Sequence, residues 1–323
     1  MTNRLVLGDS FDPWRNLAVE ELLFEGLGNG ECVFYLWQNR NTVVVGRHQN
    51  AWKECRVRLL EDEGGRLARR SSGGGAVYHD LGNLNFTYLI CRKDYDVRRQ
   101  LEVVRQAVAA FGVEAAFSGR NDLLAGGAKF SGNAFRFTDR VGMHHGTLMV
   151  DVDMDRVARY LAPDPGKLRA KGIESVRSRV RNLAEINPSI TIDALRDALI
   201  QEFSTEFGRY EVLRVSELDP DALREKTEKF ASWDFRLGRA LPFDATLERR
   251  FPWGGVTLAL KLREGRVAQT SVYSDAMDVD LIDRIPPALV GARYDNASLA
   301  RAVRQVGGAQ AEDLAGWLME ESL

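Results

Sequence analysis

Residues 69–80 of the chain read RRSSGGGAVYHD, in which two arginines are followed closely by three consecutive glycines. Glycine lets the backbone approach another group closely, and successive N–H groups in such a loop can bind an anion. Arginine adds a permanent charge and several donors that suit phosphate and carboxylate groups. The glycine spacing differs from that of the P-loop and dinucleotide motifs. The stretch therefore predicts either a ligand-binding loop of another kind or, as for most glycine runs, a tight turn.

The sequence around this loop predicts interspersed helices and strands. Asp12 and Pro13 are typical of a helix N-cap and first helical residue, and apolar residues continue the helix to Leu23. Apolar residues at steps of three and four indicate a second helix before Gly112 and a third near residues 195–203. Short β-branched, aromatic or alternating runs predict strands at residues 33–37, 42–45, 84–90, 113–117 and 147–150.

The last part of the chain predicts a separate small domain. Apolar residues alternate strictly from Val256 to Leu262, and a charged turn leads to a second strand that runs to Tyr273, as in a hairpin. Prolines and a glycine pair precede this hairpin, so we place a domain boundary near residue 245. The predicted fold class is α/β (α+β), with a large mixed-sheet domain at residues 1–245 and a small α+β domain at residues 246–323.

Composition limits the classes of function. The 323 residues are 45% hydrophobic and 28% charged, which is typical of a globular protein with a sizeable core. A formal net charge of -2 provides no cationic surplus for nucleic acid or an anionic membrane, and no apolar stretch has membrane-spanning length. We expect a cytoplasmic, monomeric protein that binds neither nucleic acid nor membrane. The spacing and odd number of the cysteines favour reduced thiols: Cys32, Cys55 and Cys91.

A second polar region contains SGRND at residues 118–122 and KFSGNAF at residues 129–135. Its simpler interpretation is a pair of strands joined by a turn at Gly126-Gly127, with Lys129 in solvent. The functional interpretation is that Lys129 projects from a strand into a cleft. There it would neutralise a carboxylate and an α-phosphate together during acyl-adenylate formation.

Two more segments are notable for their histidines and arginines. His144 and His145 are neighbours in a predicted strand, so their side chains point to opposite faces, and we expect packing roles rather than a metal site. The basic run KGIESVRSRVRNL at residues 171–183 is interleaved with apolar residues. It predicts either a solvated face or a segment that closes over an anionic nucleotide.

Taken together and in this order, these segments resemble the lipoate-protein ligases. The similarity also includes the small C-terminal domain, through FPWGG at residues 251–255 and the alternating strand that follows. The other matching segments are LWQN (36–39), TVVVGR (42–47), QNAWKEC (49–55), residues 69–80, LGN (81–83), GRND (119–122), Lys129 with Ser131-Gly132, HHGTL (144–148), KGI (171–173) and SVRSRV (175–180). The resemblance implies a large domain of the biotin/lipoate ligase type.

The resemblance also implies the roles of individual residues. Lys129 aligns with the central lysine of the family, which contacts the ligand carboxyl region and the phosphate. The residues implied to bind ATP are Arg70, Gly75, Ala76, Val77, Tyr78, Asn121, Asp122 and Lys129. The residues implied to bind lipoate are Ser72, Gly73, Gly74, Gly75, His79 and Lys129. Asp122 is expected to serve a Mg²⁺ ion held by the phosphates, and the strands around Val44 and Phe86 to wall a tunnel for the lipoyl tail.

By this resemblance the protein is a ligase that converts free lipoate and ATP to lipoyl-AMP and transfers the lipoyl group to a carrier lysine. The expected partners are lipoyl domains of 2-oxoacid dehydrogenase acyltransferase subunits and the glycine cleavage carrier protein. A related alternative is an octanoyl or lipoyl transferase that uses an acyl-carrier-protein donor without ATP. A further alternative is a catalytically silent lipoyl-binding protein, against which the presence of Lys129, Arg70 and the glycine loop argues.

Overall fold

The computed structural model describes residues 2–118, 122–161, 180–237 and 244–321. The chain divides into two compact units. The first comprises Met1–Val44, Lys53–Ala68 and Val77–Ser232, and the second comprises Val45–Trp52, Arg69–Ala76 and Trp233–Leu323. Two short segments from the first quarter of the chain therefore belong to the same unit as its C-terminal part.

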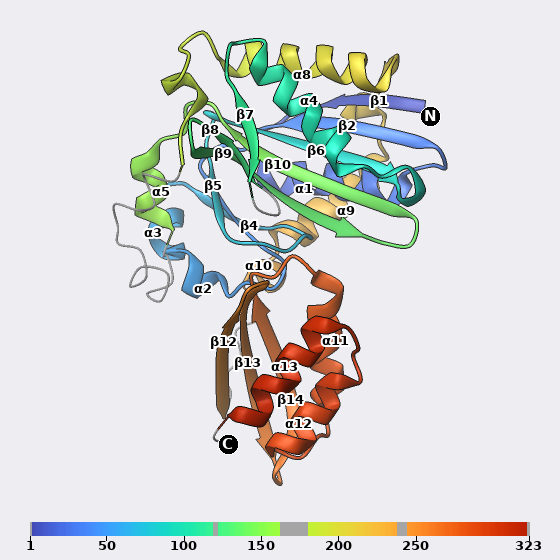
Figure 1. Ribbon diagram of the computed structural model, residues 1–323. Helices are drawn as coiled ribbons and strands as arrows, with labels where there is room; N and C mark the ends of the chain where they lie inside the picture. Colours follow the sequence, from blue (N-terminus) through green and yellow to red (C-terminus); the bar gives the residue numbers. More distant parts are fainter. Residues whose placement is uncertain (1, 119–121, 162–179, 238–243, 322–323) are drawn as a thin grey trace. The chain divides into compact units, whose positions relative to one another are not determined.

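An eight-stranded mixed sheet forms the centre of the first unit (Figure 1), in the order β11-β1-β2-β6-β10-β9-β8-β7. Strand β1 is parallel to β2 and β11, and the other neighbours are antiparallel. The strands are β1 Thr2–Leu7, β2 Glu31–Trp37, β6 Asn83–Cys91, β7 Ala115–Ser118, β8 Asp122–Ala125, β9 Ala128–Phe137, β10 Val141–Met149 and β11 Tyr210–Val212. All of β6 is buried, which explains why its sequence alternates only partly between polar and apolar residues.

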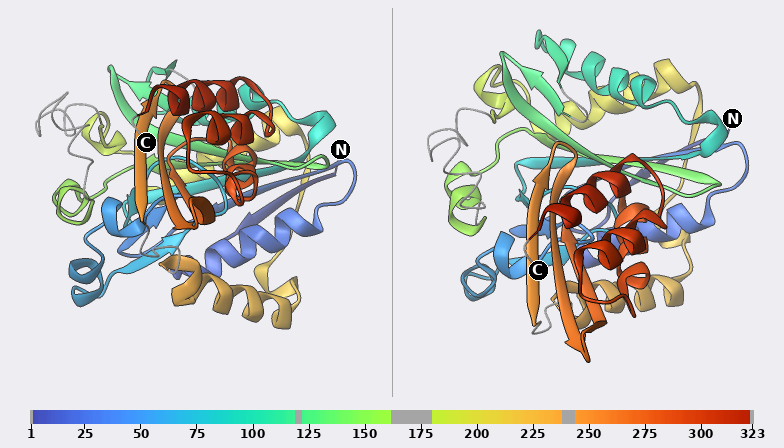
Figure 2. Two further views of the ribbon diagram at one scale, coloured as in Figure 1. Left: turned by 90° about the horizontal axis from the view of Figure 1, so that it is seen from below. Right: turned by 60° about the horizontal axis from the view of Figure 1, so that its bottom comes forward.

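Helices cover both faces of this sheet. Helices α4 and α8 lie on one face, and α1 and α9 lie on the other (Figures 1 and 2). Each begins at a side-chain cap: Asp12, Asp96, Thr191 and Asp219 accept hydrogen bonds from first-turn N–H groups. The helices of this unit are α1 Pro13–Gly26, α3 Val57–Asp62, α4 Val97–Ala109, α5 Met154–Tyr160, α8 Ile192–Phe207 and α9 Pro220–Ala231, with the 3-10 turns η1 Arg92–Asp94, η2 Leu183–Glu185 and η3 Val215–Glu217.

The core of the first unit fills the space between the sheet and α4 and α8. An aromatic cluster lies at its centre, with ring centroids 4.5 Å apart for Phe34 and Tyr88 and 4.9 Å apart for Phe34 and Phe203. Phe203 and Phe34 are fully buried. Residues from β2, β6 and α8, far apart in sequence, thus fix the position of the helix layer on the sheet.

A smaller sheet with the order β4-β3-β5 consists of Arg66–Arg69, Thr42–Val45 and Val77–His79. Strands β3 and β5 are antiparallel, with Val43 opposite Tyr78. The chain enters and leaves the second unit at the ends of these strands, because Val45, Arg69 and Ala76 already belong to that unit.

The C-terminal part of the second unit is a three-stranded antiparallel sheet with helices packed on one face (Figure 2). Its elements are α10 Trp233–Arg236, β12 Ala245–Phe251, β13 Gly254–Arg263, β14 Arg266–Ser274, α11 Val279–Leu289, α12 Asn296–Arg304 and α13 Ala309–Glu320. Helix α2, Ala51–Glu54, lies at the edge of the segment that joins this unit from earlier in the chain. Trp317 and the apolar side of β13 belong to its core.

The expected fold class is confirmed, with a large mixed sheet and a small α+β part. The hairpin predicted near residue 263 is present, and Glu264 and Gly265 have the positive φ angles that suit a tight turn. The strand expected at residues 147–150 is longer than predicted: it runs from Val141 to Met149 and includes the histidine pair. In the part of the chain that the structure describes, no helix is both long and apolar enough to cross a membrane.

The aromatic cluster predicts a strong effect of truncation at Phe203. Phe203→Ala leaves a cavity between α8 and the sheet, so the free energy of unfolding should fall by about 3–5 kcal/mol in urea denaturation. Gln201→Ala is the matched control on an exposed position of α8 and should change it by less than about 0.5 kcal/mol. Equal effects of the two substitutions would contradict the assignment of this core.

Candidate active site

Lys129 lies on β9 and forms an ion pair with Asp122 on β8, with 2.7 Å between Nζ and Oδ1. Each side chain is about one-third exposed, at 34% and 33%. Asp122 is opposite Gly132 in the strand pairing, and a Cβ atom at Gly132 would lie 2.9 Å from Lys129 Cε and Nζ. Because Gly132 has no side chain, the Lys129 ammonium group can lie over this position and reach the Asp122 carboxylate.

A register shift in the β8–β9 pair sets the direction of Lys129. Leu123 is opposite Ser131 whereas Leu124 is opposite Lys129, so Phe130 is an extra residue in β9. Such a bulge turns the neighbouring side chains and is common beside functional sites. Phe130 is fully buried, and the Lys129 carbonyl accepts a hydrogen bond of 2.8 Å from the Arg181 N–H. The backbone at Lys129 is thus held from two sides while its side chain stays accessible.

The sheet face toward α1 carries a buried polar network. The Glu20 carboxylate accepts a hydrogen bond of 2.7 Å from Thr87 Oγ1 and lies 2.8 Å from His145 Nδ1. Trp37 Nε1 donates to Thr87 Oγ1 at 3.1 Å. Burial opposes ionisation of Glu20, yet interaction with His145 and Thr87 lowers its pKa below the ordinary value. This face therefore combines a buried carboxylate with aromatic surface.

His79, predicted to bind lipoate, joins the same region of the first unit. Its Nδ1 lies 3.1 Å from Asn39 Nδ2, and its ring meets Trp37 edge-on with 6.3 Å between centroids. Because Asn39 Nδ2 donates, His79 Nδ1 accepts, which places the proton of the neutral ring on Nε2. Asn16 from α1 donates to Asn39 Oδ1 at 3.0 Å and fixes the amide orientation.

His144 points to the opposite face of β10, as the sequence predicted for neighbouring strand residues. It is fully buried, with Nδ1 2.9 Å from Gln100 Oε1 and Nε2 2.9 Å from Asn133 Oδ1. Burial lowers its pKa to about 3, so the ring is neutral and only one nitrogen donates. The other ring nitrogen must accept a hydrogen bond. The Gln100 side chain supplies the donor when its amide NH₂ group, rather than its oxygen, faces His144 Nδ1.

The glycine loop lies in the second unit and is organised by Arg70. The Arg70 guanidinium donates to the carbonyls of Gly73 at 2.6 Å and Gly75 at 2.8 Å, and its Nε donates to Ser72 Oγ at 3.1 Å. Gly74 has a φ of 90°, which an L side chain rarely adopts. Arg70 thus holds the loop in a curved conformation in this structure.

Arg69 has a different role from its neighbour and was not among the predicted site residues. Its side chain is 2% exposed, and its NH1 donates to the carbonyls of Gly46 at 2.9 Å and Gln49 at 2.7 Å. It also donates to the carbonyls of Phe235 and Arg236 in α10, at 3.0 and 2.7 Å. A buried guanidinium with several carbonyl partners fixes three chain segments of the second unit.

The predicted site residues fall into two groups, one in each unit. The first unit contains Val77, Tyr78, His79, Asp122 and Lys129, and the second contains Arg70, Ser72, Gly73, Gly74, Gly75 and Ala76. Asn121 lies outside the described residues, as do residues 171–179 of the basic run at 171–183. The structure brings together Lys129 with Asp122, and Arg70 with its own loop.

Glu20 and Trp37 were absent from the sequence-based set. Asn16 and Glu20 are four residues apart on α1 and both are buried together with Leu17, so polar residues among the apolar positions of this helix are the signal that could have indicated Glu20. His145 was expected only to pack, but it also contacts the Glu20 carboxylate. Among the described residues, no group of three His, Cys, Asp or Glu side chains is arranged to hold a metal ion.

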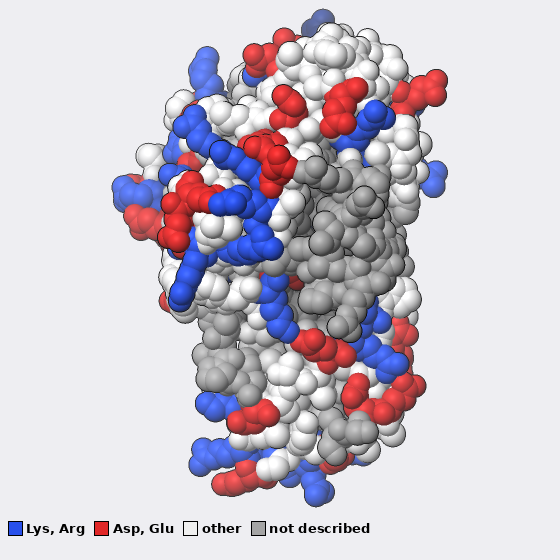
Figure 3. Space-filling view, turned by 90° about the vertical axis from the view of Figure 1, so that its left-hand side faces the viewer, with Lys and Arg blue, Asp and Glu red and all other residues white. Residues whose placement is uncertain are grey.

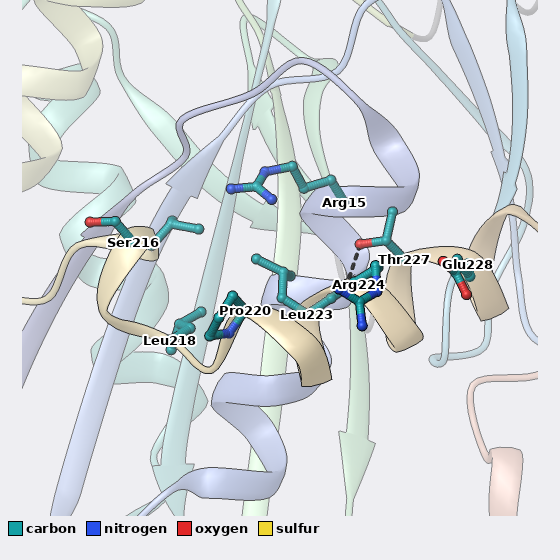
Figure 4. Close-up of a pocket in the computed structure, with 9 residues that line it drawn as sticks. Arg15, Ser216, Leu218, Pro220, Leu223, Arg224, Thr227 and Glu228 are labelled. Carbon is teal, nitrogen blue, oxygen red and sulfur yellow. Dashed lines mark hydrogen bonds between the residues drawn. The ribbon is translucent and has the colours of Figure 1, made fainter.

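A pocket of about 330 Å³ lies between α1, η3 and α9 (Figure 4). None of its lining residues belongs to the predicted site. Arg15 and Arg224, on its rim, are already paired with Asp9 and Asp221. The pocket is therefore separate in composition from the lysine and glycine-loop groups.

Charges of both signs alternate on the face that includes α3 and α5 (Figure 3). Arg159 and Tyr160 of α5 both contact the Glu63 carboxylate, and these bonds lower the Glu63 pKa to about 2. Arg156 is paired with Asp153 at 3.4 Å. The described part of this face is thus a mixture of ion pairs rather than a uniformly basic surface.

Comparison with known proteins identifies two family regions in the chain. Residues 12–204 match the lipoyl protein ligase A/B catalytic domain, and residues 240–318 match the bacterial lipoate protein ligase C-terminus. The two matches follow one another in the order that the sequence analysis expected.

Solved structures give the same result. The structure of LipL1 from P. falciparum in complex with lipoate is 25% identical, with a TM-score of 0.88 over 99% of this chain and 100% of that one. Lipoate-protein ligase A bound with ATP is 27% identical, with a TM-score of 0.66 over 74% of this chain and 99% of the other. The bipartite lipoate protein ligase of Thermoplasma acidophilum, studied with its E2 lipoyl domain, is 27% identical, with a TM-score of 0.68 over 76% and 100%.

Buried His144 predicts a dependence of stability on pH. Its pKa is about 3 when folded and about 6.5 when unfolded, so the unfolded chain binds more protons between these values. Its contribution to stability is present above about pH 6.5 and is lost as the pH falls toward 3. Between pH 7 and pH 5, the free energy of unfolding should fall by ~2 kcal/mol more in the wild type than in His144→Gln. Parallel pH profiles in urea denaturation would rule this out.

Proposed function

The chain belongs to the lipoyl protein ligase A/B catalytic-domain family, and from this premise we propose how its residues carry out the ATP-dependent attachment of lipoate to protein. It is a lipoate-protein ligase, an enzyme that forms an amide through an acyl adenylate. We propose that residues 1–245 are its lipoate- and ATP-binding catalytic domain and residues 246–323 its accessory domain. The family matches at residues 12–204 and 240–318 support this division.

The reaction has two steps. A lipoate carboxylate oxygen attacks the α-phosphorus of ATP, the bond to the β-phosphate oxygen breaks, and pyrophosphate leaves. The amine of a carrier lysine then attacks the acyl carbon of lipoyl-AMP, the bond from carbon to the AMP oxygen breaks, and AMP leaves as the amine loses a proton. The first step brings negative charges together, so it needs a cation at the reacting groups.

Lys129 is the residue that we propose for this task. The observation that carries the proposal is the placement of its ammonium group over Gly132, beside Asp122 and on a bulged strand. The Lys129 side chain is partly exposed, and the Lys129 backbone is held by a hydrogen bond. This combination suits a cation that must bind an anionic substrate. When substrate binds, its carboxylate and phosphate oxygens take over contacts that Asp122 makes in this structure.

We further propose roles for the remaining predicted residues. Arg70 and the backbone of Gly75, Ala76, Val77 and Tyr78 bind the nucleotide, and Ser72, Gly73, Gly74 and His79 bind lipoate. The face that carries Trp37, Glu20 and His145 offers apolar rings and a buried polar end to the lipoyl tail. Phe86 itself packs in the core between the sheet and α4 and α8, so we propose that its strand walls the tunnel through the opposite face, which carries Thr87.

We propose Mg²⁺ as the cofactor that accompanies ATP. Mg²⁺ usually binds through one or two carboxylates together with substrate phosphates, and keeps several waters. Asp122, a partly exposed single carboxylate beside Lys129, fits this pattern. When bound, the ion would neutralise phosphate charge; Asp122 would hold it and Lys129 would face the reacting carboxylate.

We propose lipoyl domains as the acceptors, in particular those of 2-oxoacid dehydrogenase acyltransferase subunits and the glycine cleavage carrier protein. One similar ligase was studied with its E2 lipoyl domain, which supports this class of partner. We also propose a monomer in the cytoplasm. The free, buried thiols of Cys32, Cys55 and Cys91 suit a reducing compartment.

The ATP-independent transferase is the less favoured function. It uses an acyl-carrier-protein donor, whereas this chain also matches the ligase C-terminus and resembles a ligase bound with ATP. Lipoylation of a purified lipoyl domain with free lipoate, with and without ATP, separates the two functions.

Replacement of Lys129 tests the activation step. Lys129→Ala should lower lipoate-dependent ATP–pyrophosphate exchange about a hundredfold or more, because it removes a charge that stabilises the transition state. Lys93→Ala is the matched control, since Lys93 is exposed on η1 and should leave exchange unchanged. Wild-type exchange rates in Lys129→Ala would exclude this residue from catalysis.

Removal of divalent cations tests the proposed ion. Excess EDTA should abolish exchange and added Mg²⁺ should restore it, and Asp122→Asn should raise the Mg²⁺ concentration needed for half-maximal rate. The melting temperature should not change with EDTA, because the described residues lack a protein-only metal cluster. Exchange that persists in EDTA would show that the ion is dispensable.

A further inference from the structure

The glycine loop and the segment Val45–Trp52 contact each other closely within the second unit. The Arg47 N–H donates to the Ser72 carbonyl at 2.9 Å. A Cβ atom at Gly46 would lie 2.3 Å from the Gly74 carbonyl oxygen, so only glycine fits where the two segments cross. The conformation of the loop therefore depends on the position of Val45–Trp52.

Both segments are also held by residues at the end of β14 and just after it. The Ser274 N–H donates to the His48 carbonyl at 3.0 Å, and the Gly74 N–H donates to the Ala276 carbonyl at 3.3 Å. A Cβ atom at Gly73 would lie 2.2 Å from the Ala276 oxygen. Gly73 is thus required for close backbone approach to Ala276, whatever it also contacts in a substrate.

The residues that hold the loop are themselves held by hydrogen bonds and by burial. Ser274 Oγ donates to the Gly255 carbonyl at 2.7 Å and accepts from the Ala276 N–H at 3.0 Å, which fixes the turn after β14. Helix α11 begins directly afterwards, and its Ile282 and Ile285 are fully buried in the core of the small sheet. A rigid support is the property that a positioning element needs.

Asp283 on α11 adds the charged contact. Its Oδ2 lies 2.8 Å from an Arg47 nitrogen, and its Oδ1 lies 3.5 Å from His48 Nε2. His48 is 4% exposed and Asp283 39% exposed, so one carboxylate at the surface contacts two successive residues of the buried segment. This pair connects α11 with the segment that the glycine loop crosses.

We propose that Ser274–Asp283 is a clamp that positions the glycine loop for lipoate, with Asp283 as a positioning residue for the activation step. The proposal rests on the proposed function, because it assumes that the loop binds lipoate. The C-terminal part of the second unit then acts on substrate affinity without touching the substrate. A loop that is clamped in the competent conformation binds more tightly than one that must be ordered first.

The test compares Asp283→Asn with Asp280→Asn, which removes the same charge from an exposed position on α11. In ATP–pyrophosphate exchange, Asp283→Asn should raise the KM for lipoate by about two- to fivefold with kcat within about 1.5-fold, the loss expected for a partly exposed ion pair. Asp280→Asn should keep the wild-type KM, and Asp283→Glu should restore most of the affinity.

Amide hydrogen exchange of residues 69–76, measured by mass spectrometry, is the readout that does not depend on activity. It should be faster in Asp283→Asn than in the wild type and unchanged in Asp280→Asn. The clamp would be overturned if residues 69–76 exchanged their amide hydrogens at the wild-type rate in Asp283→Asn, or if the rate changed equally in both variants. If the wild type shows no pyrophosphate exchange, the proposed function fails, and loop exchange still decides whether the clamp exists.

Discussion

Burial of the central strands on both faces is the constraint on which the first unit depends. Strand β10 is covered on each side, so the neighbouring His144 and His145 enter two different environments. His144 is neutral among core side chains, whereas His145 meets the Glu20 carboxylate. Because successive side chains of a strand point to opposite faces of the sheet, these two neighbouring histidines take part in two separate hydrogen-bonded networks, one on each face.

The sequence predicted the elements whose signals are local. The Asp12 cap, the alternating hairpin and the turn at Gly126-Gly127 each depend on a few neighbouring residues, and all three are present. It did not predict that β2 and β3 belong to different sheets, because pairing depends on strands far apart in the chain. The bulge at Phe130 was equally hidden, since it appears only when β8 and β9 are paired.

The candidate site also combines features that the sequence indicated with features that only the structure shows. Lys129 and the glycine loop were identified through resemblance, and the structure adds reasons that the sequence could not contain. Gly132 is needed so that Lys129 can cross the strand, and Gly73 so that the loop can approach Ala276. The two neighbouring arginines also differ: Arg69 donates to carbonyls of two other segments, while Arg70 bonds within its own loop. Such differences follow from backbone geometry, which residue type alone does not encode.

The second unit is assembled from Val45–Trp52, Arg69–Ala76 and Trp233–Leu323. During synthesis from the N-terminus, the first two segments leave the ribosome long before Ala276 and Asp283 are made. The strands of the first unit have their partners by then, but the glycine loop has not yet met the turn after β14. The loop can therefore form these hydrogen bonds only after residues 274–283 have been made, and a nascent chain that ends before them lacks the contacts.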